Sequence, residues 1–274
     1  MAAETPVVVQ AMSGRAARRM RMRRRLPQIL TTIAVIIIAD LVVASGVLVR
    51  SAFVTIPQLV DGLYQQIQTA TYWNAVGLTL EGWILGLGLA VGVAIPLGIA
   101  IGTMPFIYRS LRFVIDFLRP IPSIALIPLF ILIFGITLKF KIYLVAIGAF
   151  WPMLFQTMYG VQDVDPVARD TARAYGLNPL MRFIFVLVPG ATPYIATGLR
   201  LSATYALLTA VATELLVGVP GIGAEIFRAQ QSNNIKVIWA LIVTSGLIGL
   251  LISAVFTRLE RKTLMWHPSQ RESS

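Results

Sequence analysis

The residue types that support metal and redox chemistry are nearly absent from this chain of 274 residues. It has no cysteine and one histidine, His267, so neither a disulfide framework nor a Cys/His metal site can be assembled. None of its four lysines, Lys139, Lys141, Lys236 and Lys262, follows a glycine, so the phosphate-binding loop of an ATPase is missing. We therefore expect a protein that is not an enzyme and that binds no cofactor or metal itself.

Four ionisable residues lie inside or beside apolar stretches, where a charge is costly unless it is paired or hydrated. They are Asp40, Glu81, Arg200 and Glu214. Arg200 and Glu214 lie about 21 Å apart along one predicted helix, too far to pair with each other. Each can pair with another helix or reach an interface, and Arg200 has the alternative of guiding an anionic substrate along a transport path.

Residues 161–192 carry clear signals for the start and end of helices. Asp165-Pro166 is typical of an N-cap followed by the first helical residue, and Gly176 of a left-handed helix end. Asn178-Pro179 repeats the start signal, which predicts two short helices joined at a glycine bend. The prolines expected to mark the entry into the next apolar stretch are Pro189 and Pro193.

The first of these short helices has one readable face. Ala168 and Ala172 stand four residues apart and allow a close approach, whereas Arg169 and Arg173 put two positive charges on one edge. Asp170 can neutralise only one of them. The pattern fits a helix that docks on a partner with an acidic rim, and the alternative is a solvated charged loop.

Prolines interrupt the apolar pattern near residue 120. Arg119-Pro120-Ile121-Pro122-Ser123 is followed by Pro128, which predicts an irregular or kinked start of the apolar stretch there. Irregular backbone at membrane depth must be buried in protein or face a water-filled cavity. This segment therefore either packs inside the protein or lines a path.

A glycine-rich loop at residues 218–235 precedes the last apolar stretch. It contains Gly221 and Gly223, and residues 224–231 are expected to form a short amphipathic helix on the outer face. The loop can act as a gate or as a contact for an external protein. The alternative is an ordinary surface loop.

The elements that must position these residues are membrane helices. Hydrophobic residues make up 57% of the chain and charged residues 13%, with a mean hydropathy of +0.79, which excludes a water-soluble enzyme. The basic residues lie between apolar runs rather than in one stripe, which argues against a nucleic-acid partner. Six runs are long enough to cross a lipid bilayer: 28–49, 76–102, 114–136, 142–160, 193–217 and 236–257.

The distribution of basic residues predicts the orientation of these spans. With both termini in the cytoplasm, 17 of the 23 Lys and Arg residues lie on the cytoplasmic side and five on the outer side. Seven arginines precede the run 28–49, as in a signal peptide, but this run is too long and no cleavage site follows it. We therefore expect a retained first span.

Three motifs together resemble the EAA loop of bacterial ABC importer permeases. They are Asp170-Thr171-Ala172, then Gly176, then Val186-Leu187-Val188-Pro189, at the spacing that the loop has. Asp replaces the usual Glu, Thr the first Ala, and Val both Ile and Leu. The resemblance extends over residues 28–268 and points to the nitrate/sulfonate/taurine branch of binding-protein-dependent permeases.

Further segments carry this resemblance. Arg119-Pro120-Ile121-Pro122 with Pro128-Leu129, Gly198-Leu199-Arg200 and the ending Trp266-His267-Pro268 are similar to segments of that branch. Glu214 matches a glutamate that precedes the Gly-rich outer loop. Two residues depart from the pattern: Gly82 stands where an arginine is expected, and Gln156 replaces an asparagine.

The resemblance implies an all-α type I importer permease of about six transmembrane helices in the bacterial inner membrane, with both termini cytoplasmic. It implies three kinds of partner: a second permease, two ATP-binding subunits that dock on the EAA loops, and an extracytoplasmic binding protein. The second permease is expected to be another copy of this chain, so that the two form a homodimer. ATP and Mg would be held by the ATP-binding subunits. The implied cargo is a small, anionic solute such as a sulfonate, taurine or nitrate.

The expected site residues form two groups. Those expected to couple to the ATPase are Pro166, Ala168, Arg169, Asp170, Ala172, Arg173, Gly176 and Pro189. Those expected in the path or gate are Pro122, Pro128, Arg200, Glu214, Gly221 and Gly223.

The expected organisation is a basic tail 1–27, a permease domain 28–268 with the coupling loop 161–192, and a short tail 269–274. An ion-coupled secondary transporter is the alternative function, although no inverted repeat or cluster of ion ligands is evident. A membrane scaffold protein is a further alternative, but it gives no reason for the EAA spacing.

Overall fold

The computed structural model describes residues 27, 30, 31, 34, 35, 37, 38, 40–45 and 52–263, which form helices and connecting turns and no strand. The tail up to residue 26, much of the run 28–49, the Trp266-His267-Pro268 ending and the tail 269–274 lie outside these residues. The chain divides into two units, 1–59 and 60–274. In the first, Asp40 accepts a hydrogen bond of 2.7 Å from the backbone N–H of Ile56. The all-helical class is confirmed for the described residues.

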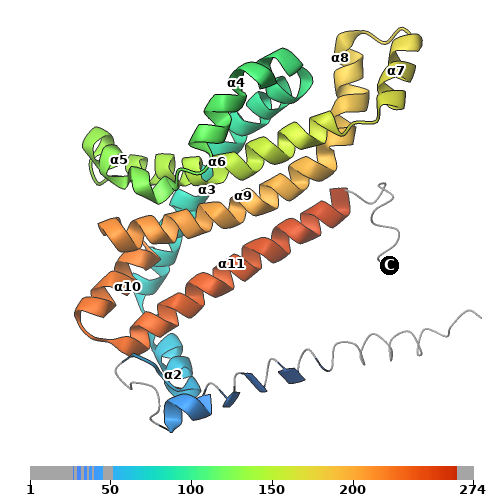
Figure 1. Ribbon diagram of the computed structural model, residues 1–274. Coiled ribbons are helices and arrows are strands. Elements are labelled where there is room, and N and C mark those ends of the chain that lie inside the picture. The colour runs from blue at the N-terminus through green and yellow to red at the C-terminus, as the bar shows by residue number, and fades with distance from the viewer. Residues whose placement is uncertain are drawn as a thin grey trace, which may run out of the picture. The chain divides into compact units, whose positions relative to one another are not determined.

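Within the described residues, four helices are long and apolar enough to cross a membrane. They are α3 (Ala70–Thr103), α6 (Leu138–Gln162), α9 (Val188–Val217) and α11 (Ile235–Thr263). In Figure 1, α9 lies between α6 and α11, and α3 crosses this layer. Before them stands α2 (Ile56–Ile67).

The expected span 114–136 is not one straight helix. α4 (Pro105–Leu118) meets the 3₁₀ turn Ser123–Leu126 and α5 (Ile127–Phe134) at a bend of 80°. The break falls on the predicted Pro-rich segment, because Pro120 and Pro122 cannot donate the hydrogen bonds that a continuous helix needs. Counting the bent pair as one, the described residues contain up to five spans.

Small residues bring α3, α6 and α9 close together, as expected for helices in lipid. A Cβ at Gly98 or Gly102 would come within 3.0 Å of the α6 residues Thr157 or Met158. Gly88 and Gly92, which have the same four-residue spacing on α3, make no such approach, because nothing lies within 4 Å of an added Cβ there. Buried alanines fill the shared core: Ala94, Ala149, Ala203, Ala206 and Ala210.

The loop 161–192 begins as predicted and then differs. α7 (Pro166–Ala174) is a separate short helix, but α8 (Pro179–Arg182) continues through a π turn, Phe183–Leu187, into α9. Pro189 and Pro193 thus lie inside the first turns of α9 rather than before it. The widened turn precedes Pro189, which has no N–H to offer to the regular helical pattern.

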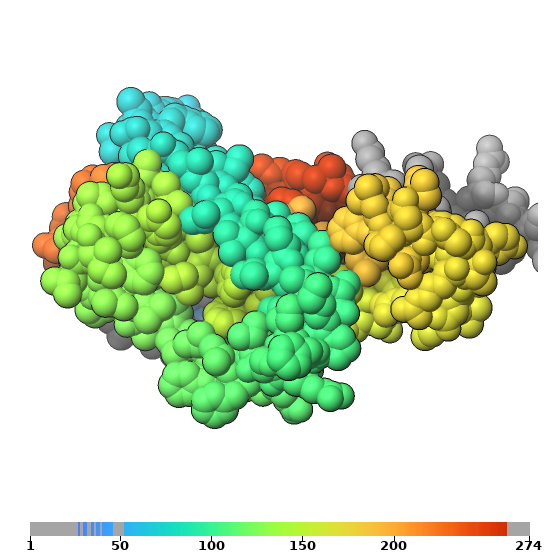
Figure 2. Space-filling model, turned by 90° about the horizontal axis from the view of Figure 1, so that it is seen from above, coloured from blue at the N-terminus to red at the C-terminus, as the bar shows by residue number. Residues whose placement is uncertain are grey.

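α7 and α10 mark opposite ends of α9. α10 (Ile222–Gln231) follows the glycine-rich loop and confirms the short helix predicted over 224–231. In Figure 1, α10 lies at the far end of α9 from α7 and α8. Figure 2 shows α7 and α8 (yellow) as one projection and α4 (green) as another.

Candidate functional site

α7 is shaped by the predicted local signals. The Asp165 carboxylate accepts a hydrogen bond of 2.8 Å from the N–H of Val167, and Pro166 occupies the first turn. At the other end, Leu177 N–H donates to the carbonyl of Ala172 (3.1 Å), and Gly176 has φ +73°. An added Cβ at Gly176 would meet nothing, so it is the backbone conformation that requires glycine.

The residues expected on the coupling surface do not all face outward. Ala172 is buried, and Arg169 donates a hydrogen bond back to the carbonyl of Val161 at the end of α6. Arg173 pairs with Asp170 at 3.1 Å and is exposed. The inner residues therefore hold α7 in place, while the outer residues remain available to a partner.

Two large apolar side chains on this outer face were missed from the sequence. Val167 is 70% exposed and Tyr175 81% exposed, next to the exposed Ala168. For Val167 a signal was present, since it is five residues before Ala172 and so lies on another helix face, whereas Tyr175 follows the last residue of α7 and had no such signal. Pro189, expected among the coupling residues, lies half-buried in the first turn of α9.

A buried ion pair joins α6 to α9. Lys141 Nζ lies 2.8 Å from Glu214 Oε1, and their side chains are 1% and 0% exposed. The ammonium group also donates to the carbonyls of Leu78 (2.8 Å) and Pro220 (3.2 Å), so all three of its protons have acceptors.

The other carboxylate oxygen of Glu214 is equally engaged. Its Oε2 accepts hydrogen bonds from Thr79 Oγ1 (2.9 Å) and from the N–H of Gly223 (3.0 Å). Thr79 Oγ1 in turn accepts from the N–H of Ile222 (2.9 Å). A saturated polar network of this kind fixes the first turn of α10 against α3, α6 and α9.

The placement of Lys141 corrects the sequence interpretation. Lys141 is one of the five basic residues that the predicted topology assigned to the outer side, but it lies in the first turn of α6 and points into the protein. Gly82 makes this possible, because an added Cβ there would overlap Lys141 Cε. The departure from the expected arginine at residue 82 thus has a steric reason.

The expected gate glycines gather around the same carboxylate. Gly221 has φ +155°, and an added Cβ would overlap the Glu214 carboxylate. A Cβ at Gly223 would overlap the carbonyl of Val211 on α9. Glu214, Gly221 and Gly223 are therefore brought together, whereas Pro128 lies apart in α5.

Arg200 is held by α11. Its guanidinium lies 3.0 Å from Glu260 Oε2, and Thr197 Oγ1 donates to Glu260 Oε1 (3.2 Å). Of the two interpretations of Arg200, the structure favours pairing between helices over an open path.

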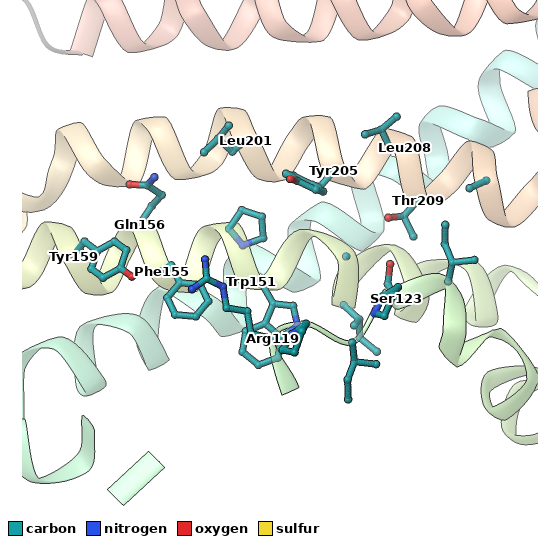
Figure 3. Close-up of a pocket in the computed structure, with 18 residues that line it drawn as sticks. Arg119, Ser123, Trp151, Phe155, Gln156, Tyr159, Leu201, Tyr205, Leu208 and Thr209 are labelled. Atoms are coloured by element: carbon teal, nitrogen blue, oxygen red, sulfur yellow. The ribbon is translucent and has the colours of Figure 1, made fainter. Parts of the chain in front are cut away.

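A cavity of about 730 Å³ lies between the bend after α4 and the middle of α6 and α9. Pro122, an expected path residue, lines it, and Pro128 and Arg200 do not. Figure 3 shows Arg119 and Ser123 on the bend, Trp151 and Phe155 on α6, and Tyr205 on α9 around this space. Arg119 was not recognised from the sequence as a cavity residue.

The aromatic residues of α6 form a ladder beside Arg119. The ring centroids of Trp151 and Phe155 are 6.1 Å apart, and those of Phe155 and Tyr159 6.0 Å. The Arg119 guanidinium carbon lies 4.5 Å from the Phe155 centroid, a cation–π contact. Across the part of the chain that the structure describes, no three His, Cys, Asp or Glu residues are placed to hold a metal ion.

Comparison with known proteins identifies a family and several relatives. The family described as the binding-protein-dependent transport system inner membrane component matches residues 92–265. The taurine transport system permease protein TauC of Escherichia coli (strain K12) is 32% identical over 86% of this chain and 88% of its own length. The nitrate import permease protein NrtB of Leptolyngbya laminosa is 33% identical over 72% of this chain and 71% of its own.

A solved structure shares the fold. A chain of the MetNI methionine ABC transporter in an inward-facing conformation superposes with a TM-score of 0.64 at 20% identity. The match covers 70% of this chain and 96% of that chain.

Proposed function

This chain belongs to the family of binding-protein-dependent transport system inner membrane components, and from that premise we propose which solute it carries and how it is driven. It is a multi-pass protein of the inner membrane and the permease subunit of an ABC importer. Its proposed cargo is a small anion of the class named in its relatives, a sulfonate, taurine or nitrate.

The exposed, preformed helix α7 is the observation that carries the proposed mechanism. The chain has no phosphate-binding loop, so ATP and Mg are bound by separate subunits. Two such subunits dock on the α7 helices of two permease copies, and an external binding protein delivers the solute. Closure of the ATP-binding subunits moves α7 as a rigid element, and α7 passes this motion to α9.

The test is uptake by the purified complex in proteoliposomes. ATP inside the vesicles and the binding protein outside should drive uptake of taurine, an alkanesulfonate or nitrate. Uptake that needs an ion gradient and no ATP would instead establish the ion-coupled alternative, to which the relatives give no support.

The proposed topology has six spans, with both termini in the cytoplasm. The distribution of Lys and Arg residues supports it. The absence of cysteine allows a direct test with single introduced cysteines. A cysteine in place of Tyr175, on the α7 loop, should react with a membrane-impermeant maleimide only in inside-out vesicles. A cysteine in place of Gln230, at the end of α10, should react only in right-side-out cells; labelling of both residues from one side would refute the topology.

Arg200 is predicted to be structural rather than a solute contact. Replacing Arg200 by Gln should leave the solute concentration for half-maximal uptake unchanged and cost about 1 kcal/mol or less of stability, as expected for a partly exposed ion pair. Glu260→Gln is the matched control and should have the same small effect in thermal denaturation. A loss of solute affinity in Arg200→Gln alone would contradict this assignment.

A further inference from the structure

The cavity beside α6 has one charged lining residue, Arg119, and no acidic one. Its remaining polar side chains are neutral and come from three segments: Ser123 on the bend, Gln156 and Tyr159 on α6, and Tyr205 and Thr209 on α9. A single cation surrounded by neutral donors attracts an anion and repels a cation.

Arg119 is positioned for such a role. Among the described residues, no carboxylate pairs with Arg119, and of the arginines without an ion pair it is the one that lines this cavity. The Phe155 ring covers one face of its guanidinium and leaves the N–H edge available to a ligand. Figure 3 shows the guanidinium next to the ladder of aromatic rings rather than directed away from it.

The walls and the volume indicate the shape of the ligand. Trp151, Phe155 and Tyr205 offer flat, largely apolar surfaces in the same cavity as Arg119. A volume of about 730 Å³ is in the usual range of small-molecule sites, of about 300 to 1,000 Å³. A bare inorganic ion would contact the cation and leave these walls unused.

We propose that this cavity is a binding station for an organic anion, whose sulfonate or carboxylate group binds Arg119 and whose carbon body packs on the aromatic walls. The inference rests on the proposed function and deepens it, because it selects organic anions over nitrate and names the residue that holds the charged group. The station lies along the middle of α6 and α9, between the α7 end and the α10 end of the helices.

Fluorescence quenching measures binding at this station without any transport. The probe is 4-nitrobenzenesulfonate, titrated into the detergent-solubilised transporter complex without binding protein. Saturable quenching is expected, and Trp151→Phe should remove the saturable part because Trp151 lies in the cavity. Butanesulfonate should displace the probe at least about tenfold better than nitrate, because only butanesulfonate has a carbon body for the aromatic walls.

The charge of Arg119 is tested by matched variants. Arg119→Gln should weaken probe binding about 10- to 100-fold, the range for loss of a charge-assisted hydrogen bond, and Arg119→Lys should lose less. Arg112→Gln, on exposed α4 and paired with Asp116, is the control and should bind as the unsubstituted complex does. Equal binding by Arg119→Gln, or displacement by nitrate as strong as by butanesulfonate, would overturn the proposal.

Uptake assays separate this inference from the proposed function. In proteoliposomes, Arg119→Gln should lose most sulfonate uptake while the ATP-binding subunits still co-purify and hydrolyse ATP. Normal sulfonate uptake by Arg119→Gln would refute the station and leave the importer assignment intact. Absence of ATP-driven uptake in the unsubstituted complex would refute the importer assignment, whereas the quenching assay would still decide on the station.

Discussion

Replacing Lys141 by methionine should destabilise the folded chain by about 3–5 kcal/mol, because the buried Glu214 carboxylate then has no cation. Neither side chain is open to water, so hydration cannot replace the lost partner. The substitution also leaves the carbonyls of Leu78 and Pro220 without a donor. A fall in the midpoint of thermal denaturation of the purified protein would measure the effect.

Lys139→Met is the matched control for this prediction. Lys139 lies two residues earlier in the same first turn of α6, but it is exposed and forms no ion pair with another described residue. Its replacement should change stability by less than about 0.5 kcal/mol, as for most surface positions. Equal stability of the two variants would show that the ion pair is not structural.

The contact between Lys141 and Gly82 predicts that a lysine introduced at residue 82 restores the stability lost when Lys141 is removed. In Lys141→Ala the space occupied by the lysine stem becomes free, so Gly82→Lys can supply the cation to Glu214 from α3 instead of α6. The double variant should be more stable than either single variant, with a coupling energy above about 1 kcal/mol in a double-mutant cycle. Additive losses would mean that a cation at residue 82 cannot reach the carboxylate.

Local signals predicted the short elements of this structure well. Asp165-Pro166 and Gly176 determine α7 through hydrogen bonds and dihedral angles within a few residues, so the sequence alone was sufficient. Pro120 and Pro122 predicted the bend before α5 for the same reason. α8 was predicted as a separate helix because Pro189 was taken to mark the entry into the next helix, whereas its missing N–H only widens the turn that joins α8 to α9.

The network around Glu214 could not be predicted in this way. Lys141 and Glu214 are 73 residues apart, and hydropathy alone places a lysine near the end of an apolar run in the adjoining loop. Only the packing of α3 against α6 shows that Gly82 admits the lysine side chain. Arg119 could not be recognised as a cavity residue for a similar reason, because the cavity is formed by three segments distant in sequence.

Replacing Gly176 by valine should lower ATP-driven uptake by more than about tenfold while ATP hydrolysis and membrane insertion persist. Gly176 has φ +73°, and a β-branched residue there costs about 1–2 kcal/mol or changes the backbone. The bend sets the direction of α7 relative to α8, so its distortion shifts the outer face that includes Val167 and Tyr175. The ratio of solute molecules taken up to ATP molecules hydrolysed is the measurement.

Backbone geometry at Gly176 can be separated from side-chain contact as the cause of the lost uptake, because residue types differ in how readily they adopt a positive φ. Asn adopts this conformation more readily than Ala, and Ala more readily than Val, so uptake should fall in the order Gly, Asn, Ala, Val. Side-chain size alone cannot produce an Asn variant that is more active than Ala, since nothing lies within 4 Å of an added Cβ. Gly88→Val, in the helical interior of α3 and equally open, is the control and should retain normal coupling. An Asn variant as impaired as Val would indicate that a direct contact of Gly176 with the ATP-binding subunit, rather than the geometry of the bend, transmits the motion.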